Sequence, residues 1–277
     1  MSKIISFVQN LSIDITIGAL ISCAFIAQLM EVDLTLSMYL GLAIAIWLIY
    51  TLDHLIDADK SQQKPLNPRH AFHFLHRKKI ITFASLVFLL GVVNLFYLPL
   101  STLLLGTLLA FLACLYFLYL KYRKKQEYKE YLAAFVYSSG IMVAPVSQLN
   151  AFTYESFYLF LIFFLLAFAN LILIPLYEVK LDENDAHPSM PINKGIKATE
   201  NKIRITLFST YLVMAAYGFT YGLSFIDLLV FVLMPLTLVV LMFGRQTFAR
   251  FSMYRIFADG IFFIPGLSLV FQSEYLL

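Results

Sequence analysis

Long apolar runs, separated by tight turns or by longer polar connections, dominate this 277-residue sequence. Nine of the runs are long enough, or nearly so, to cross about 30 Å of hydrocarbon at about 20 residues each. Runs of this length are typical of membrane helices. The sequence therefore predicts an all-α fold, a bundle of nine transmembrane helices in a single domain over residues 1–277, with spans at 11–30, 34–52, 79–98, 100–120, 131–149, 156–176, 203–222, 225–243 and 256–272.

Positive charge falls on one side of this nine-span pattern. All 20 Lys and Arg residues lie in the N-terminal tail or in the connections after the second, fourth, sixth and eighth runs. The positive-inside rule places that side in the cytoplasm. We therefore expect an integral protein of the cell's inner or plasma membrane, with a cytoplasmic N-terminus. Pro99, Gly222 and the segment 31–33 predict tight turns on the opposite side.

The amino-acid composition also indicates a membrane protein. Hydrophobic residues make up 61% of the chain and charged residues 13%, against about 25% charged residues in an average soluble domain. Cys23 and Cys114 lie inside apolar runs without metal-ligand spacing, so the sequence predicts neither a disulfide framework nor a zinc site. Membrane lipid is an expected partner and nucleic acid is not, while the oligomeric state is left open.

Two acidic stretches follow the second and sixth apolar runs, which cross in the same direction. Asp53 and Asp57 are four residues apart, as are Glu178 and Asp182, and the two pairs are offset by the same 125 residues. Four residues are about one helical turn, so each pair presents its carboxylates on one face. The offset also suggests a weak parallel repeat of spans 1–4 and 5–8. We expect the two stretches to meet at one site on the cytoplasmic side.

Carboxylates crowded in this way repel one another unless cations lie between them. Mg²⁺ takes one or two carboxylates per ion, together with waters and substrate phosphates. The pattern therefore predicts a Mg²⁺–diphosphate site, with a prenyl tail entering the membrane. The predicted metal ligands are Asp53, Asp57, Glu178, Asp182 and Asp185, of which Asp53, Asp57 and Asp182 are assigned to catalysis. The predicted diphosphate-binding residues are Lys64, Lys121, Arg123, Lys180 and Lys197, and the predicted cavity residues are Asn170, Tyr50 and Tyr177.

Other interpretations of the same residues stay open. An acidic and basic loop beside a membrane span is commonly a solvated connection. Four histidines that resemble a metal set are expected to lie on an amphipathic surface, namely His54, His70, His73 and His76. A transporter, a lipid-binding protein or a structural subunit of a membrane complex would share the same helix bundle.

The order of these motifs resembles the UbiA-type intramembrane prenyltransferases. That family has Asn-Asp-x-x-Asp-x-x-x-Asp after its second helix and Asp-x-x-x-Asp after its sixth. Smaller similarities are the segments Asp14-Ile-Thr-Ile-Gly-Ala-Leu20, Lys64-Pro65-Leu66, Tyr119-Leu-Lys121-Tyr-Arg123 and Gly195-Ile-Lys197-Ala-Thr199. The resemblance implies a nine-helix fold and Mg²⁺-dependent transfer of a prenyl group from its diphosphate to a lipophilic acceptor.

The sequence also departs from that family pattern. When Asp53 takes the family's Asn position, His54 replaces one Asp and Ser61 replaces the last. In the second motif Glu178 stands where the family has its first Asp. Two interpretations follow: a divergent prenyltransferase, or a non-catalytic relative that binds or transports lipid. Neither the acceptor nor the length of the prenyl chain follows from the sequence.

Overall fold

The computed structural model describes residues 3–60, 66–122, 128–185, 188–250 and 253–273, which contain helices and no strand. The helices are α1 (Lys3–Asn10), α2 (Ile13–Leu29), α3 (Leu36–Lys60), α4 (Pro68–Leu95), α5 (Leu100–Tyr122), α6 (Lys129–Ser147), α7 (Tyr154–Asn184), α8 (Met190–Lys194), α9 (Ile196–Tyr221), α10 (Phe225–Phe243), α11 (Arg245–Phe248), α12 (Met253–Gly260) and α13 (Gly266–Ser273). A short 3₁₀ helix, η2 (Ile261–Phe263), joins α12 to α13. The predicted all-α class is confirmed.

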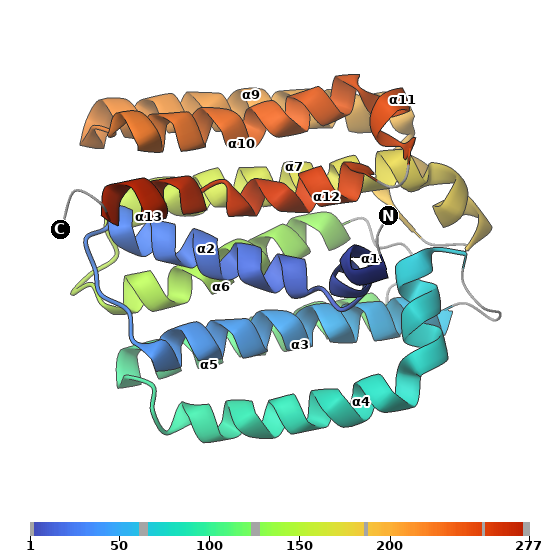
Figure 1. The fold of residues 1–277 in the computed structure, drawn as a ribbon, viewed down its shortest axis with the longest axis horizontal. Helices are drawn as coiled ribbons and strands as arrows, with labels where there is room; N and C mark the ends of the chain where they lie inside the picture. The colour runs from blue at the N-terminus through green and yellow to red at the C-terminus, as the bar shows by residue number, and fades with distance from the viewer. Residues whose placement is uncertain (1–2, 61–65, 123–127, 186–187, 251–252, 274–277) are drawn as a thin grey trace.

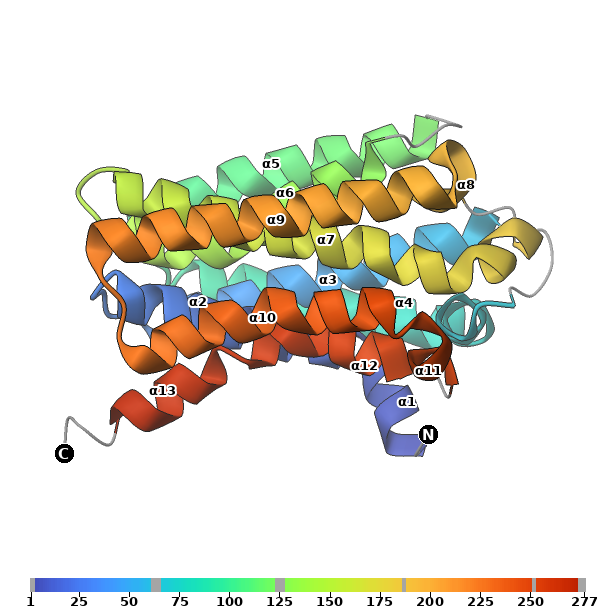
Figure 2. The same cartoon turned by 90° about the horizontal axis from the view of Figure 1, so that it is seen from above.

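The long helices lie side by side and nearly parallel to one axis (Figures 1 and 2). Helices α8 and α11 lie at one end of the bundle, with α1 in the half nearer to that end (Figure 2). Helix α13 and the turn between α9 and α10 lie at the opposite end (Figure 1). Below, the first of these ends is called the α8–α11 end.

Each predicted span coincides with a long helix or with a pair of consecutive helices. Among the described residues, however, only α3, α4, α5, α7 and α10 are long and apolar enough as single helices to cross a membrane. A sixth candidate is the pair α1–α2, which bends by 71°. The protein is thus a membrane-helical bundle with five or six candidate spans. The count of nine spans and the cytoplasmic N-terminus stay predictions.

The predicted turns have the backbone that such turns require. Glu31 after α2 has φ 53° and Gly222 after α9 has φ 76°, both in the left-handed region. Glycine adopts such angles without a steric penalty, which suits the three-residue connection at Gly222. Pro99 directly precedes α5 and ends the short connection from α4.

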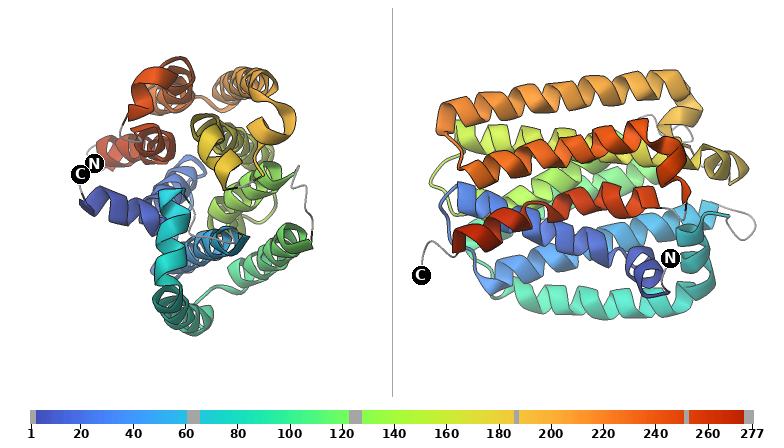
Figure 3. Two further views of the ribbon diagram at one scale, coloured as in Figure 1. Left: turned by 90° about the vertical axis from the view of Figure 1, so that its right-hand side faces the viewer. Right: turned by 45° about the horizontal axis from the view of Figure 1, so that its top comes forward.

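Helix α4 is bent near its start, and this bend shapes the α8–α11 end. His76 has non-helical angles, φ −106° and ψ 15°, so the turns before it leave the direction of the bundle. They cross the α8–α11 end, as the face-on view in the left panel of Figure 3 shows. Asn67 caps the helix by accepting a hydrogen bond from the Arg69 backbone N–H at 3.1 Å, and Pro68 occupies the first turn, where its missing N–H costs nothing.

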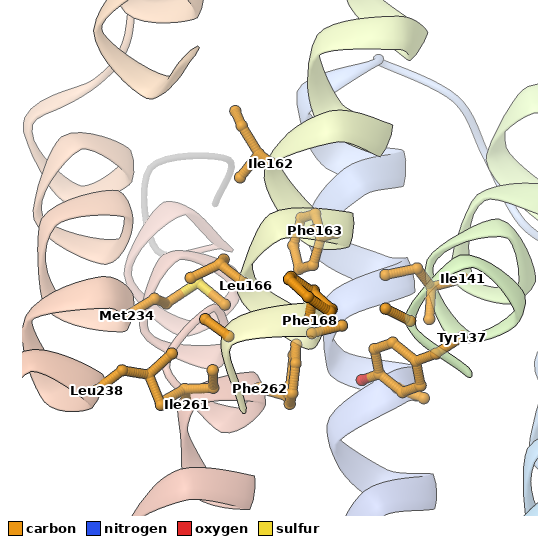
Figure 4. Close-up of a cluster of buried hydrophobic side chains, with 14 of the residues drawn as sticks. Tyr137, Ile141, Ile162, Phe163, Leu166, Phe168, Met234, Leu238, Ile261 and Phe262 are labelled. Atoms are coloured by element: carbon orange, nitrogen blue, oxygen red, sulfur yellow. The ribbon is translucent and has the colours of Figure 1, made fainter. Parts of the chain in front are cut away.

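Helix α7 lies at the centre of the bundle and α4 at its edge. Of the apolar window in α7, 61% is buried inside the protein, against 11% in α4. Buried side chains of α6, α10 and η2 pack against those of α7, as Figure 4 shows. The Tyr137 and Phe262 rings lie 5.0 Å apart between their centres. The apolar residues that α4 and α5 expose, such as Phe88 and Leu104, form the surface expected against lipid.

Candidate functional site

A cavity of about 170 Å³ lies between the helices that carry the two acidic stretches. Its wall combines apolar side chains with seven residues that carry a carboxyl, ammonium or guanidinium group: Asp53, Arg69, Lys129, Glu130, Glu178, Asp182 and Arg255. Asp53 comes from α3, Glu178 and Asp182 come from α7, and the basic residues come from α4, α6 and α12. The structure therefore brings residues of both acidic stretches to one cavity.

On the α3 side, a lysine joins the two acids. Lys129 Nζ donates to Asp57 Oδ2 at 2.7 Å and lies 3.9 Å from Asp53 Oδ1. The Lys129 side chain is 13% exposed and that of Asp57 only 3%. Burial lowers the pKa of the Lys129 ammonium, but the carboxylates of Asp53 and Asp57 outweigh burial, so the pKa is raised. Lys129 is therefore a permanent cation between these acids.

On the α7 side, Glu178 is enclosed by donors. Its Oε1 accepts from Tyr254 Oη at 2.8 Å and from Arg255 Nε at 2.7 Å, and Arg255 Nη2 lies 2.6 Å away. Its Oε2 accepts from Asn67 Nδ2 at 3.0 Å. Burial lowers the pKa of Arg255, but the charge of Glu178 outweighs burial and raises it. Both carboxylate oxygens of Glu178 are thus already used.

Two further groups at the cavity keep unused hydrogen-bonding capacity. Arg69 is 9% exposed, and its Nε and Nη2 have no hydrogen-bond partner among the described residues. Its ion pair with Asp259, Nη2 to Oδ2, is 3.7 Å long, beyond hydrogen-bond distance. Asp182 is 4% exposed, and its Oδ2 likewise has no partner in the part of the chain that the structure describes. Buried polar atoms are normally paired, so these atoms are candidates for contacts with a ligand.

Comparison with known proteins identifies the family. A model of the UbiA prenyltransferase family matches residues 15–258, which is most of the chain. The chain belongs to the UbiA prenyltransferase family. The family resemblance predicted from the motifs is therefore confirmed.

Two solved structures are similar to this UbiA-family chain. The apo structure of a UbiA homolog from Aeropyrum pernix K1 has 15% sequence identity and a TM-score of 0.72, and the match covers 93% of this chain and 98% of that one. A structure from work on the biosynthesis of digeranylgeranylglyceryl phosphate synthase in membranes has 14% identity and a TM-score of 0.60, covering 98% and 97%. At these identities the likeness establishes the fold alone. No curated protein matches the sequence.

The structure separates the predicted residues into three groups. Tyr50, Asp53, Glu178 and Asp182 line the cavity, and Asp57 is linked to it through Lys129. Three others contact the protein elsewhere. Asp185 accepts from the backbone N–H groups of Leu66 and Asn67, Asn170 donates to Asp259, and Tyr177 donates to the Leu241 carbonyl.

The predicted diphosphate-binding lysines form the third group. Lys121, Lys180 and Lys197 are exposed and do not line the cavity. Lys64 and Arg123 lie outside the described residues. The cations at the cavity are Arg69, Lys129 and Arg255 instead. In the sequence, Arg69 belongs to the connection after the second apolar run, and Lys129 and Arg255 lie at the edges of predicted spans. All three entered the sequence analysis only through the charge pattern.

The expectation of surface histidines is wrong for three of the four. His54, His70 and His73 are buried, and only His76 is exposed. The bend in α4 folds its first two turns over the end of α3, which puts the His54 ring 5.1 Å from that of His73 and 6.2 Å from that of His70. His54 also contacts Ser12 Oγ through Nε2 at 3.2 Å. These rings pack against one another and close the cavity beside Arg69.

The predicted Mg²⁺ was tested against this donor set. Within the described ranges, no group of three or more His, Cys, Asp or Glu residues is arranged to hold a metal ion. The Lys129 ammonium is bonded to Asp57, and Arg255, Tyr254 and Asn67 occupy Glu178. As arranged, these side chains do not fit the predicted cluster of metal ligands. The reaction proposed for this cavity therefore relies on protein side chains.

Proposed function

We propose that this UbiA-family protein binds a prenyl diphosphate in the cavity between α3 and α7 and transfers the prenyl group to a lipophilic acceptor. The orientation proposed from the charge pattern puts the charged end of the cavity on the cytoplasmic side. The family supplies the reaction class. The observation that supports this site in particular is Arg69, whose buried guanidinium has two nitrogens without a hydrogen-bond partner among the described residues, in a cavity that both acidic stretches line.

The two kinds of cavity wall suit the two parts of such a donor. Arg69 and Lys129 are placed to bind phosphate oxygens, because guanidinium and ammonium groups form strong charge-assisted hydrogen bonds with them. The apolar wall includes Ile46, Ile49 and Leu171, which suit a hydrocarbon chain. The diphosphate is therefore proposed at the charged end and the prenyl chain among the aliphatic residues.

The proposed reaction breaks the bond between prenyl carbon 1 and the diphosphate oxygen. Both electrons leave with the diphosphate, whose growing negative charge Arg69 and Lys129 stabilise. The allylic cation that remains accepts an electron pair from the acceptor, which then loses a proton. Three tyrosines line the cavity, Tyr50, Tyr116 and Tyr137, and aromatic faces stabilise a nearby cation.

Release of inorganic diphosphate from a panel of prenyl diphosphates tests the proposal. Purified protein in lipid nanodiscs is assayed with and without Mg²⁺, in the presence of membrane lipid extract as a source of acceptors. Arg69→Gln and Lys129→Gln should each lower the rate by about 100-fold, the usual effect of removing one charge-stabilising group. Arg204→Gln, an exposed site on α9, is the matched control and should change nothing. Full activity in both cavity variants would disprove the site.

One observation favours a second function, a non-catalytic protein that binds a prenyl diphosphate or related lipid. Each acidic pair already carries a cation of the protein, Lys129 on α6 and Arg255 on α12. Such a site can bind an anionic lipid without chemistry. Binding of the donor without turnover of any member of the panel would support this second function over the first.

A further inference from the structure

Two cations of the protein contact three of the five carboxylates that the sequence assigns to metal ions, namely Asp53, Asp57 and Glu178. Lys129 Nζ lies 2.7 Å from Asp57 Oδ2 and 3.9 Å from Asp53 Oδ1. Mg²⁺ binds carboxylate oxygens at about 2.1 Å and demands near-octahedral geometry. An ion bridging these two acids therefore competes with the ammonium for the same space between the same oxygens.

In the second acidic stretch Glu178 is occupied more completely, whereas Asp182 keeps one oxygen without a hydrogen-bond partner among the described residues. Arg255 contacts Glu178 Oε1 through two nitrogens at 2.6 and 2.7 Å, and Asn67 holds Oε2. Arg255 Nη2 also donates to Asn67 Oδ1 at 3.2 Å, which closes the network. A divalent ion at Glu178 would have to displace a buried guanidinium and an amide together. The Arg255 side chain is 11% exposed, and among the described residues Glu178 is the one carboxylate that forms an ion pair with it.

The cavity also contains a guanidinium whose hydrogen-bonding capacity is only partly used. Arg69 forms a 3.7 Å ion pair with Asp259, but its buried Nε and Nη2 have no hydrogen-bond partner among the described residues, and it lines the same cavity as Lys129 and Arg255. We propose that Lys129 and Arg255 replace the metal ions in this family member, so that the diphosphate group is bound directly by Lys129, Arg69 and Arg255. The identity of the ligand rests on the proposed function, whereas the cation replacement rests on the contacts alone.

Binding of inorganic diphosphate tests the proposal without any turnover. Isothermal titration of the purified full-length protein is run in EDTA and again in Mg²⁺, and the two dissociation constants should agree within about threefold. In parallel, Mn²⁺ is titrated and followed by its electron paramagnetic resonance signal. The wild-type protein should bind no stoichiometric Mn²⁺, with or without diphosphate. These two measurements need no variant, so a failure to fold cannot obscure them.

A substitution at Lys129 should create the metal site that the wild-type protein is expected to lack. Lys129→Met removes the ammonium but keeps most of the side-chain volume, so a divalent ion at Asp53 and Asp57 no longer competes with this ammonium. We expect the affinity for diphosphate in EDTA to fall by about tenfold or more, as befits the loss of one charge-assisted hydrogen bond. We also expect a new stoichiometric Mn²⁺ site. Lys78→Met, at an exposed lysine of α4, is the control and should keep wild-type behaviour in both assays.

The outcomes separate this proposal from the proposed function. Stoichiometric Mn²⁺ in the wild type, diphosphate binding that requires Mg²⁺, or no binding in either buffer overturns the cation replacement. Turnover of prenyl diphosphate together with strict Mg²⁺ dependence would keep the function and reject the replacement. Metal-independent binding without turnover would keep the replacement and reject prenyl transfer.

Discussion

Neutralisation of Glu178 should lower the stability of the fold. Its two oxygens accept bonds from Tyr254, Arg255 and Asn67, and its side chain is 6% exposed. Glu178→Gln keeps the shape of the side chain but removes the counter-charge of Arg255. The guanidinium is then buried next to a neutral amide.

The expected loss follows from the burial of this pair. Removing one partner of a buried ion pair costs about 3–5 kcal/mol, because the remaining charge stays desolvated. The glutamine oxygen still accepts one hydrogen bond, which places the estimate at the lower end, about 3 kcal/mol. At about 2–4 °C per kcal/mol, the thermal midpoint should fall by about 6–12 °C. Intrinsic fluorescence of the protein in detergent, recorded during heating, measures this shift.

A matched pair and a double substitution make the test strict. Glu200 also pairs with an arginine, Arg245, but the distance is 3.7 Å and both side chains are about one-third exposed. Glu200→Gln should therefore cost less than about 1 kcal/mol. The pair Glu178→Leu with Arg255→Met should be more stable than either single change, because no charge is left alone. A Glu178→Gln shift no larger than that of Glu200→Gln, or strictly additive energies in the double variant, would refute the reasoning.

Two further predictions concern the supports of the site. Asp185→Ala removes the acceptor of two backbone N–H groups, those of Leu66 and Asn67 at 2.9 and 3.0 Å. Amide hydrogen exchange across residues 66–70 should therefore become at least about tenfold faster. Unchanged protection of these amides would contradict this role of Asp185. Gly195→Ala, at φ 87° before α9, should lower stability by about 1 kcal/mol or more, whereas Gly106→Ala, a helical position where the added carbon meets nothing within 4 Å, should be neutral or stabilising in the same thermal assay.

The fold class followed from the sequence because apolar runs of membrane length leave few alternatives. The same applies to the meeting of the acidic stretches, since one helical turn separates the members of each pair and the two helices end at the same side. The number of spans followed less directly from the apolar runs. Helix α9 begins with several charged side chains, and α12 and α13 are separated by a 3₁₀ turn, so neither passes as a single apolar helix. One domain and a weak internal repeat stay predictions.

The cations that pair with these acids could not be predicted from the sequence pattern. Lys129 is 72 residues from Asp57, and Arg255 is 77 residues from Glu178. Only the packing of α6 and α12 against α3 and α7 decides that these cations, and not the nearer lysines, reach the carboxylates. The bend at His76 was equally hidden, because no proline or glycine stands at that point of α4. Without the bend, Arg69 and the histidines would remain at the surface.

Asn67 links the site to the order in which the chain is made. It contacts Glu178 across 111 residues and Arg255 across 188, so the network closes only when the last helices are in place. Chains are synthesised and folded from the N-terminus. During biogenesis the carboxylate of Glu178 therefore has no guanidinium partner until α12 has been synthesised. A chain that ends before α12 would retain the central helices but lack a completed site. Packing of the C-terminal helices is therefore the final step of assembly.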